Sequence, residues 1–144
     1  MNQEEKILKT CRTVAVVGLS PNAERPSFRV ASYLQEQGYK IIPVNPNFSE
    51  ILGETSYPDL ASIGEPVDVI DIFRRAEETP AIVEQAIAKG AKAVWMQEGV
   101  VNRTAARIAR KAGLMVVMDR CMRKEHLKMQ REKMRQEVGD AQNK

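Results

Sequence analysis

The sequence predicts an α/β fold, a single domain with a doubly wound parallel sheet of about six strands and a charged C-terminal helix. Short apolar runs alternate with segments of helical periodicity, connections are brief, and most runs end at glycine or proline. The length of 144 residues suits one domain. We divide it into a body, residues 1–121, and a basic tail, residues 122–144.

Five apolar runs should form buried strands, because strands covered on both faces read as continuous apolar segments. They are residues 13–18, 40–46, 68–73, 93–97 and 114–119. A short edge strand near residues 54–57 and a weak helical turn around Leu60 are also expected. In chain numbering, the expected strand order is 3-2-1-4-5-6.

Three segments between the strands should be helices, at residues 26–38, 77–90 and 102–113. They end at Gly38, Gly90 and Gly113, and glycine commonly follows the last turn of a helix. Pro80 lies near the start of the second, where its missing N–H costs nothing. Each helix then crosses from one parallel strand to the next.

Composition excludes several classes of protein. Two isolated cysteines and one histidine are too few for a zinc site of the usual spacing or for a disulfide framework, so we expect no metal site. The low cysteine content also suits a protein of the reducing cytoplasm, which is the expected location. The charged N-terminus is unlike a signal peptide, and no run is long enough to span a membrane. Seven aromatic residues supply few platforms for stacking nucleic-acid bases.

The net charge of +3 resides in the tail. Residues 1–121 hold 15 basic and 15 acidic residues, so the body has no electrostatic footprint for duplex DNA and a nucleic-acid partner is not expected. The tail should be one polar helix that frays before Gly139, with a thin apolar stripe of Leu127, Met134 and Val138. It either leans on the body, contacts a second copy, or is a basic arm that docks on an acidic partner protein or RNA.

The predicted topology places a ligand crevice beyond the carboxyl ends of the strands, where the strand order reverses. That point lies between the first strand and residues 68–73. The segments that meet there are residues 18–25, 43–47, 73–75 and 96–99.

The rim of this crevice is suited to phosphate. Gly18 lets the chain leave the strand closely, and the following N–H groups and the Ser20 and Asn22 side chains can bind an anion. Three cations are expected at the same rim: Arg25, Lys40 and Arg74. We therefore expect a ligand that carries several phosphate charges.

The sequence disfavours NAD. The three glycine positions of a dinucleotide fingerprint hold Gly18, Ser20 and Ala23, and the acidic position after the second strand holds Asn45. A ligand with an additional ribose phosphate is still allowed. An NADP-linked or other nucleotide-linked enzyme is therefore the alternative to a binding protein.

No catalytic set is visible. The single histidine, His126, lies in the tail, far in sequence from the rim motifs. Glu98 is the best single carboxylate, and Asp71 should have a cap or an arginine partner. Cys121 should lie near the ligand side, where it is either a half-buried apolar residue or a thiol able to exchange with a ligand thiol. We expect no catalytic residue.

Six segments together resemble the small stand-alone CoA-binding domain proteins, a family similar to the N-terminal domain of the succinyl-CoA synthetase alpha subunit. They are GLSPNAERPS, GYKIIPVNP, ILGETSYPDL, VDVIDIFRRAEETP, AIAKGAKAVWMQEGV and AGLMVVMDRC, between Thr13 and Cys121. The resemblance implies a Rossmann-like domain that binds coenzyme A or acyl-CoA in the crevice. The synthetase also needs a second domain with a phosphorylated histidine, which these residues do not provide, so ligase activity is not expected.

The resemblance also implies which residues touch the cofactor. The loop that matches the phosphate-wrapping segment is Gly18, Leu19, Ser20 and Pro21. Lys40 matches a CoA-contacting lysine, and a later strand end matches at Met96, Gln97 and Glu98. Arg25, Phe73 and Arg74 belong to motifs of the stand-alone family. Asn45 and Pro46, placed in the crevice by topology, complete the expected cofactor-binding set.

Overall fold

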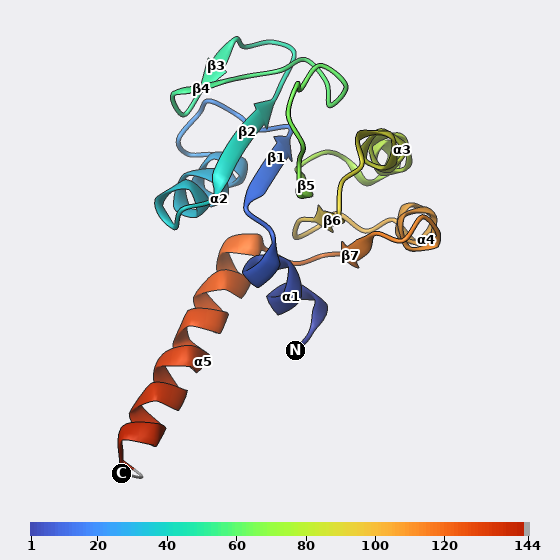
Figure 1. Ribbon diagram of the computed structural model, residues 1–144. Helices are drawn as coiled ribbons and strands as arrows, with labels where there is room; N and C mark the ends of the chain where they lie inside the picture. The colour runs from blue at the N-terminus through green and yellow to red at the C-terminus, as the bar shows by residue number, and fades with distance from the viewer. Residues whose placement is uncertain (143–144) are drawn as a thin grey trace.

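The computed structural model describes residues 1–142 and shows a five-stranded parallel sheet with helices on both faces (Figure 1). The strands are β1 (Thr13–Val17), β2 (Lys40–Val44), β5 (Val69–Ile72), β6 (Ala93–Met96) and β7 (Met115–Val117). Their order is β2-β1-β5-β6-β7. Because β2 and β5 lie on opposite sides of β1, the order reverses at β1. The predicted fold class and the predicted reversal point are both confirmed.

The helices form two layers. They are α1 (Gln3–Thr10), α2 (Pro26–Glu36), α3 (Thr79–Lys89), α4 (Arg103–Lys111) and α5 (Met122–Gln142), with a 3₁₀ turn η1 (Ala76–Glu78) before α3. The helices α1, α2 and α5 cover one face of the sheet, and α3 and α4 cover the other (Figure 1). Gly90, with φ 81°, ends α3 as predicted.

The alternation of side chains along each strand divides the core in two. In β1, Ala15 packs with the α3/α4 face, whereas Val14 and Val16 pack with the α1/α2/α5 face. Trp95 of β6 is fully buried on this second face. Both faces of the sheet are therefore dry, which leaves only its edges and ends for a ligand.

The expected sixth strand does not join the main sheet. Instead, β3 (Glu50–Ile51) and β4 (Glu54–Thr55) pair with each other in antiparallel fashion. Leu52 and Gly53 between them have φ values of 56° and 73°, the positive pair that closes a two-residue hairpin turn. This segment pairs with the main sheet through one isolated parallel bridge, between Tyr57 and Val44. Around Leu60, where a weak helical turn was expected, the chain makes a hydrogen-bonded turn, with the Ile63 N–H donating to the Leu60 carbonyl and Asp59 accepting hydrogen bonds from Ser62.

The two ends of the chain also differ from expectation. No helix was predicted at the N-terminus, yet Asn2 caps α1 by accepting from the Glu5 N–H at 2.8 Å, and Ile7 and Leu8 are buried. At the other end, α5 passes Gly139 and continues to Gln142, so the predicted fraying is wrong. Residues 143–144 of the expected tail lie outside the described residues. None of the helices in residues 1–142 has the length and apolar character that crossing a bilayer requires.

Candidate functional site

Two adjoining cavities open at the carboxyl ends of the strands, of about 830 Å³ and about 760 Å³. They share a ridge of five residues: Gly18, Ser20, Arg25, Arg74 and Glu78. The first cavity extends toward Phe73, Gln97, Glu98, Val100 and Cys121. The second extends over the loop after β2, with Pro21, Asn45, Pro46, Asn47 and Phe48 in its lining. The four segments that the topology was expected to bring together do meet here.

Gly18 holds the two halves of the ridge in contact. Its φ is 88°, and a Cβ at this position would lie 2.3 Å from the carbonyl oxygen of Phe73 and 2.9 Å from Cδ of Arg74. The Gly18 N–H donates to the Val44 carbonyl at 3.0 Å. No other residue fits this position, because a side chain would push the loop after β1 away from the loop after β5.

The loop after Gly18 uses its own polar groups to fix its shape. The N–H of Ser20 donates to Oγ of Ser27, that of Asn22 to Oγ of Ser20, and that of Glu24 to Oδ1 of Asn22. These three N–H groups are therefore not free to bind an anion, contrary to the expectation for this loop. The first turn of α2 lies next to this loop, since Pro26 and Ser27 line the first cavity, and the N–H groups of a first turn, apart from that of proline, lack helical partners.

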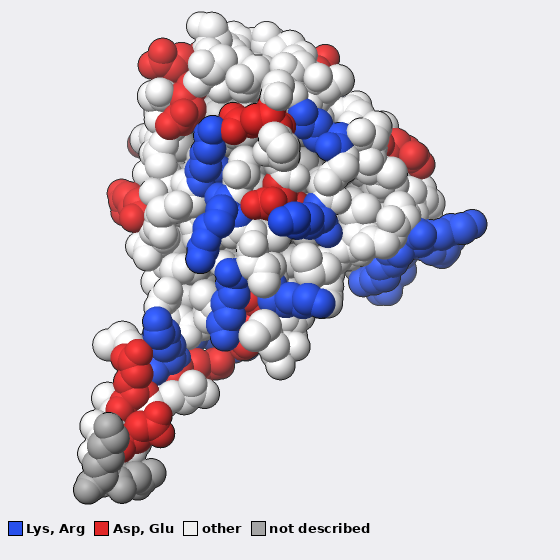
Figure 2. All heavy atoms as spheres, in the orientation of Figure 1, with Lys and Arg blue, Asp and Glu red and all other residues white. Residues whose placement is uncertain are grey.

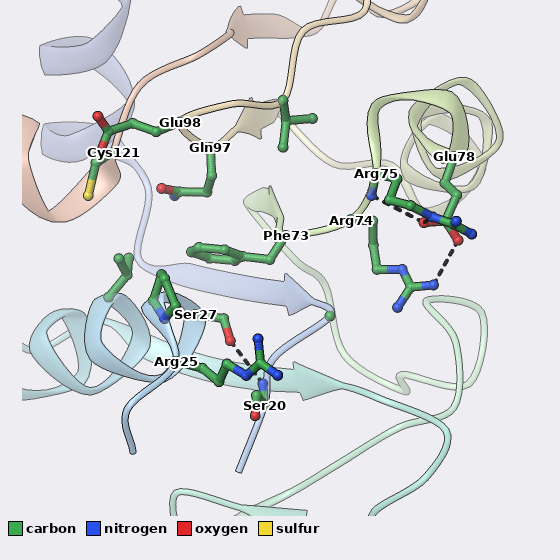
Figure 3. A pocket seen from close by; sticks show the side chains of 14 residues that line it. Ser20, Arg25, Ser27, Phe73, Arg74, Arg75, Glu78, Gln97, Glu98 and Cys121 are labelled. Carbon is green, nitrogen blue, oxygen red and sulfur yellow. Dashed lines mark hydrogen bonds and ion pairs between the residues drawn. The ribbon is translucent and has the colours of Figure 1, made fainter. Parts of the chain in front are cut away.

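Arginines supply positive charge on both sides of the ridge. Arg25 is exposed and makes no ion pair with any residue from 1 to 142. Arg74 donates to Glu78 at 2.7 Å, and Glu78 also accepts from the Arg75 N–H at 3.1 Å. The Arg74 guanidinium holds the pKa of the Glu78 carboxyl below its ordinary value. One of the two arginines on the ridge, Arg74, is therefore already paired with a carboxylate (Figure 3).

Lys40 lies elsewhere, and the prediction that it shares this rim is wrong. It is the first residue of β2 and pairs in register with Thr13, at the amino-terminal edge of the sheet. Five strand residues separate the two edges by about 13 Å. Its ammonium group instead pairs with Glu65 at 2.5 Å.

Two further members of the expected set do not present their side chains to either cavity. The side chains of Leu19 and Met96 are fully buried in the core and line neither cavity. The Leu19 carbonyl accepts from Nδ2 of Asn45 at 3.0 Å, which ties the loop after β1 to the loop after β2. Strand-end position alone did not reveal which way these side chains point.

Gln97, which lines the first cavity, is hydrogen-bonded to the buried carboxyl group of Asp71. Gln97, 2% exposed, donates through Nε2 to Oδ1 of Asp71 and accepts at Oε1 from the Met122 N–H at 3.4 Å. Asp71 is fully buried, and its Oδ2 has no partner within residues 1–142. Burial raises the pKa of Asp71 to about 7. The arginine partner or cap expected for Asp71 is therefore replaced by Gln97.

The remaining polar side chains around the first cavity include Glu98 and Cys121. Glu98 pairs with Lys124 at 2.9 Å, and Cys121 is a half-buried free thiol that lines the first cavity. His126 belongs to α5 and lines neither cavity; its Nδ1 is 2.6 Å from the Tyr33 hydroxyl. Within the described chain, no three side chains of His, Cys, Asp or Glu gather as metal ligands. The ring of Phe73 crosses the cavity between Gln97 and Ser27 (Figure 3).

Sequence reasoning missed several lining residues. Ser27, Val30, Glu78 and Val100 all contribute to the first cavity. Glu78 had a usable signal, because it follows Arg74 by four residues at a predicted helix start. Ser27 could have been inferred from its place in the first turn after the loop. Val30 and Val100 carried no signal apart from their apolar character.

Three comparisons place this crevice in context. The CoA binding domain family matches residues 12–127. The chain is 38% identical over 122 residues to the uncharacterized protein YneT of Bacillus subtilis, which covers 85% of this chain and 90% of that protein. A solved structure of a hypothetical protein from Pyrococcus horikoshii OT3 has 42% identity and a TM-score of 0.85, covering 89% of this chain and 92% of that one.

A longer relative carries a similar segment. The chain is 35% identical over 83 residues to the ADP-forming acetate–CoA ligase II of Archaeoglobus fulgidus. That match spans 56% of this chain but only 12% of the ligase. The family match covers most of the chain and both loops of the ridge, and the protein belongs to the CoA binding domain family.

Proposed function

We propose that this protein binds coenzyme A, free or acylated, in the crevice and has no catalytic machinery of its own. One observation carries the proposal. The close contact of Gly18 with Phe73 and Arg74 sets a cationic ridge between two cavities, in a chain of the CoA binding domain family.

The chemistry of the crevice fits the parts of coenzyme A. The phosphates need positive charge and helix N–H groups, which Arg25, Arg74 and the start of α2 supply on the ridge. The second cavity offers amide side chains and one aromatic ring that suit adenine: Asn22, Asn45, Asn47, Gln85 and Phe48. The first cavity, with Phe73, Val30 and Val100, suits the pantetheine arm and a short acyl group.

Binding would exchange one anion for another at Arg74. In the structure, the Glu78 carboxylate forms an ion pair with this guanidinium. A phosphate offers more charge and more acceptor oxygens than a carboxylate, so it would displace Glu78 and keep the arginine paired. Arg25 has no ion pair among residues 1–142, so a ligand phosphate would give it a new one without displacing a carboxylate.

The proposed lack of catalysis is supported by the hydrogen bonds and ion pairs of the polar groups beside the first cavity. Glu98 is paired with Lys124, and Gln97 is held by Asp71 and the Met122 N–H. A general base must be able to accept the reacting proton; the Glu98 carboxylate is already paired with Lys124, and the Gln97 amide is not basic. The match to the ADP-forming acetate–CoA ligase II covers only 12% of the length of that ligase. We transfer CoA binding from that relative and not ligation.

Isothermal titration calorimetry with CoA, dephospho-CoA, acetyl-CoA and NADPH tests the proposal. CoA and acetyl-CoA should bind, with weaker binding for dephospho-CoA. Arg25→Gln should weaken CoA binding about 10- to 100-fold, because a charge-assisted hydrogen bond contributes about 1.5–3 kcal/mol. Arg29→Gln, one turn along α2, is the matched control, and Lys40→Gln should change nothing, since Lys40 is at the opposite edge.

Three outcomes would contradict the proposal. Binding of NADPH without CoA would favour a nucleotide-linked enzyme in the same crevice. Equal losses from Arg25→Gln and Arg29→Gln would place the ligand elsewhere. Steady release of free thiol from acetyl-CoA in the presence of the protein would show that it is an enzyme after all.

A further inference from the structure

A groove of about 690 Å³ lies between α4 and Met118, the residue that follows β7. We call it the α4 groove. It is separate from the crevice, because none of its lining residues lines either cavity there. The lining combines four cations with two apolar residues and contains no acidic or aromatic side chain: Arg103, Ala106, Arg107, Arg110, Lys111 and Met118. The α4 groove is therefore suited to an anionic partner.

The four cations project from one side of α4, and Figure 2 shows Lys and Arg side chains gathered where α4 lies in Figure 1. Because a helix turns by about 100° per residue, these four positions fall within an arc of about 100°. Ala105 and Ala109 lie on the opposite side and are fully buried in the core. Arg103 and Lys111 are about 12 Å apart along the helix axis. The cations thus form a short, solvent-exposed row on a helix that is held in place by its other side.

The charge of this row is not compensated by the rest of the molecule. None of the ion pairs within residues 1–142 involves any of the four cations. Arg107 is four residues from both Arg103 and Lys111, a spacing at which like charges destabilise a helix. Arg103 is also the first residue of α4, where the helix dipole favours acidic side chains, yet the first turn has none. The stability of the helix does not account for these residues, whereas a bound anion would.

We propose that the α4 groove binds an acidic segment of a partner protein. Three of its four cations are arginines, whose planar guanidinium groups pair with carboxylates through two parallel hydrogen bonds. Met118 and Ala106 provide an apolar floor, and a methionine side chain adapts its shape to an apolar side chain placed against it. Because the groove shares no lining residue with the crevice, this proposal does not depend on CoA binding.

The composition of the groove favours an acidic polypeptide over the other large anions. No lining residue is aromatic, so nucleic-acid bases would find nothing to stack on and only their phosphates would be bound. A helix that binds a lipid surface presents its apolar side to the membrane, but the apolar side of α4 is buried in the core. An acidic segment that carries an apolar side chain uses both the cations and the floor.

Fluorescence anisotropy with a labelled synthetic peptide tests the proposal. The probe is a helical peptide of about fifteen residues with Glu at every fourth position and Leu three residues after each Glu. Its carboxylates then repeat at about 6 Å, the separation of Arg103 and Arg107 along α4. We expect a Kd on the order of 10–100 μM at about 0.1 M salt, with weaker binding as the salt concentration rises. The same peptide with Gln in place of Glu should not bind.

Two double variants locate the peptide. Arg107→Gln with Arg110→Gln removes two guanidinium groups from the groove and should weaken binding about 10-fold. The matched control is Arg131→Gln with Arg135→Gln, which removes two exposed arginines from α5 and gives the same net charge. This control should leave the affinity unchanged. Neither double variant should lower the thermal midpoint, because all four arginines are exposed.

A wild-type protein that leaves the acidic peptide unbound at about 1 mM would overturn the proposal. Equal losses of affinity in the two double variants would also overturn it, because the attraction would then be one of general charge. A single-stranded DNA oligonucleotide or a phosphatidylserine vesicle that binds more tightly than the peptide, and loses affinity only in the groove variant, would assign the groove to nucleic acid or to a membrane surface instead.

Discussion

At the scale of single residues, Gly18 combines two constraints that are separable by mutation. Its positive φ of 88° disfavours any side chain, and its missing Cβ makes room for the Phe73 carbonyl. Gly113 has nearly the same φ, 89°, but nothing lies within 4 Å of the position a Cβ would take. The two glycines therefore share the conformational constraint and differ in the steric one.

Gly18→Ala should consequently cost more stability than Gly113→Ala. The positive φ should cost each variant about 1–2 kcal/mol. Gly18→Ala must also move the Phe73 backbone, so we expect it to lose at least about 1 kcal/mol more and to lose CoA affinity. Urea denaturation and calorimetry of the two variants measure both effects. Equal losses of stability with intact CoA binding would mean that the ridge does not depend on this contact.

At the scale of elements, the first turns of α5 are docked by an aromatic cluster. The imidazole of His126 lies edge-on to the rings of Tyr33 and Tyr39, with ring centres 5.4 Å and 5.8 Å away. Burial lowers the pKa of His126. Arg12 and Arg123 stack on the same two tyrosines, so an imidazolium would also meet positive charge.

Docking of α5 should therefore weaken in acid. A histidine whose pKa is lowered by folding stabilises the docked state fully above its unfolded pKa of about 6.5, and this contribution is lost as the pH falls through the folded value. Amide exchange over Met122–Met129, corrected for the intrinsic rate, should rise between about pH 7.5 and about pH 5. His126→Gln keeps a hydrogen-bonding group for Tyr33 but cannot be protonated, so its protection should not change with pH. If both proteins lose protection equally, the histidine is not the cause.

Elements that depend on local pattern were predictable, and those that depend on competition between partners were not. The five strands and the helices α2, α3 and α4 follow from apolar runs ended by Gly38, Gly90 and Gly113. The segment around Gly53 has β character, but the sequence does not say that a hairpin would win over the sheet edge. The helix α1 was missed because its stability comes from burying Ile7 and Leu8 against distant elements.

The parts of the candidate site that follow from sheet topology were also predictable from the sequence. Topology brought Gly18, Arg25, Arg74 and Gln97 together, because the carboxyl ends of parallel strands share one edge. Lys40 was misplaced because neither its charge nor its motif match takes account of its position at the start of a strand, on the opposite edge of the sheet. The division of the chain at residue 121 stays a prediction.

At the scale of the whole molecule, Asp71 puts a buried carboxyl in the central strand of the sheet. Its neighbours in register are Val16 and Trp95, both in the core on the α1/α2/α5 face. Burial raises its pKa from 3.8 to about 7, with the hydrogen bond from Gln97 acting in the opposite direction. The strand can be unfolded only with the sheet, so this proton is coupled to global unfolding.

Asp71 should make the protein less stable as the pH rises from about 4 to about 7. In that window the unfolded chain has lost the proton that the folded chain still holds, so stability falls by up to about 1.4 kcal/mol per pH unit. Asp71→Asn remains neutral and still accepts from Gln97 through Oδ1. It should match the wild type near pH 4 and exceed it by on the order of 2–4 kcal/mol near pH 8, in urea denaturation at a series of pH values.

Asp68, just before the same strand, gives the control of opposite sign. Burial alone would raise its pKa, but hydrogen bonds from the Arg12 and Thr13 N–H groups and the ion pair with Lys92 lower it. Its ionised form stabilises the fold, a contribution present above the unfolded pKa of about 4 and lost as the pH falls through the lower folded value. Asp68→Asn should therefore lose stability near pH 8, where Asp71→Asn gains it. A stability curve for Asp71→Asn that runs parallel to the wild type would show that Asp71 is ionised in the fold, and that its unpartnered oxygen finds a cation or water.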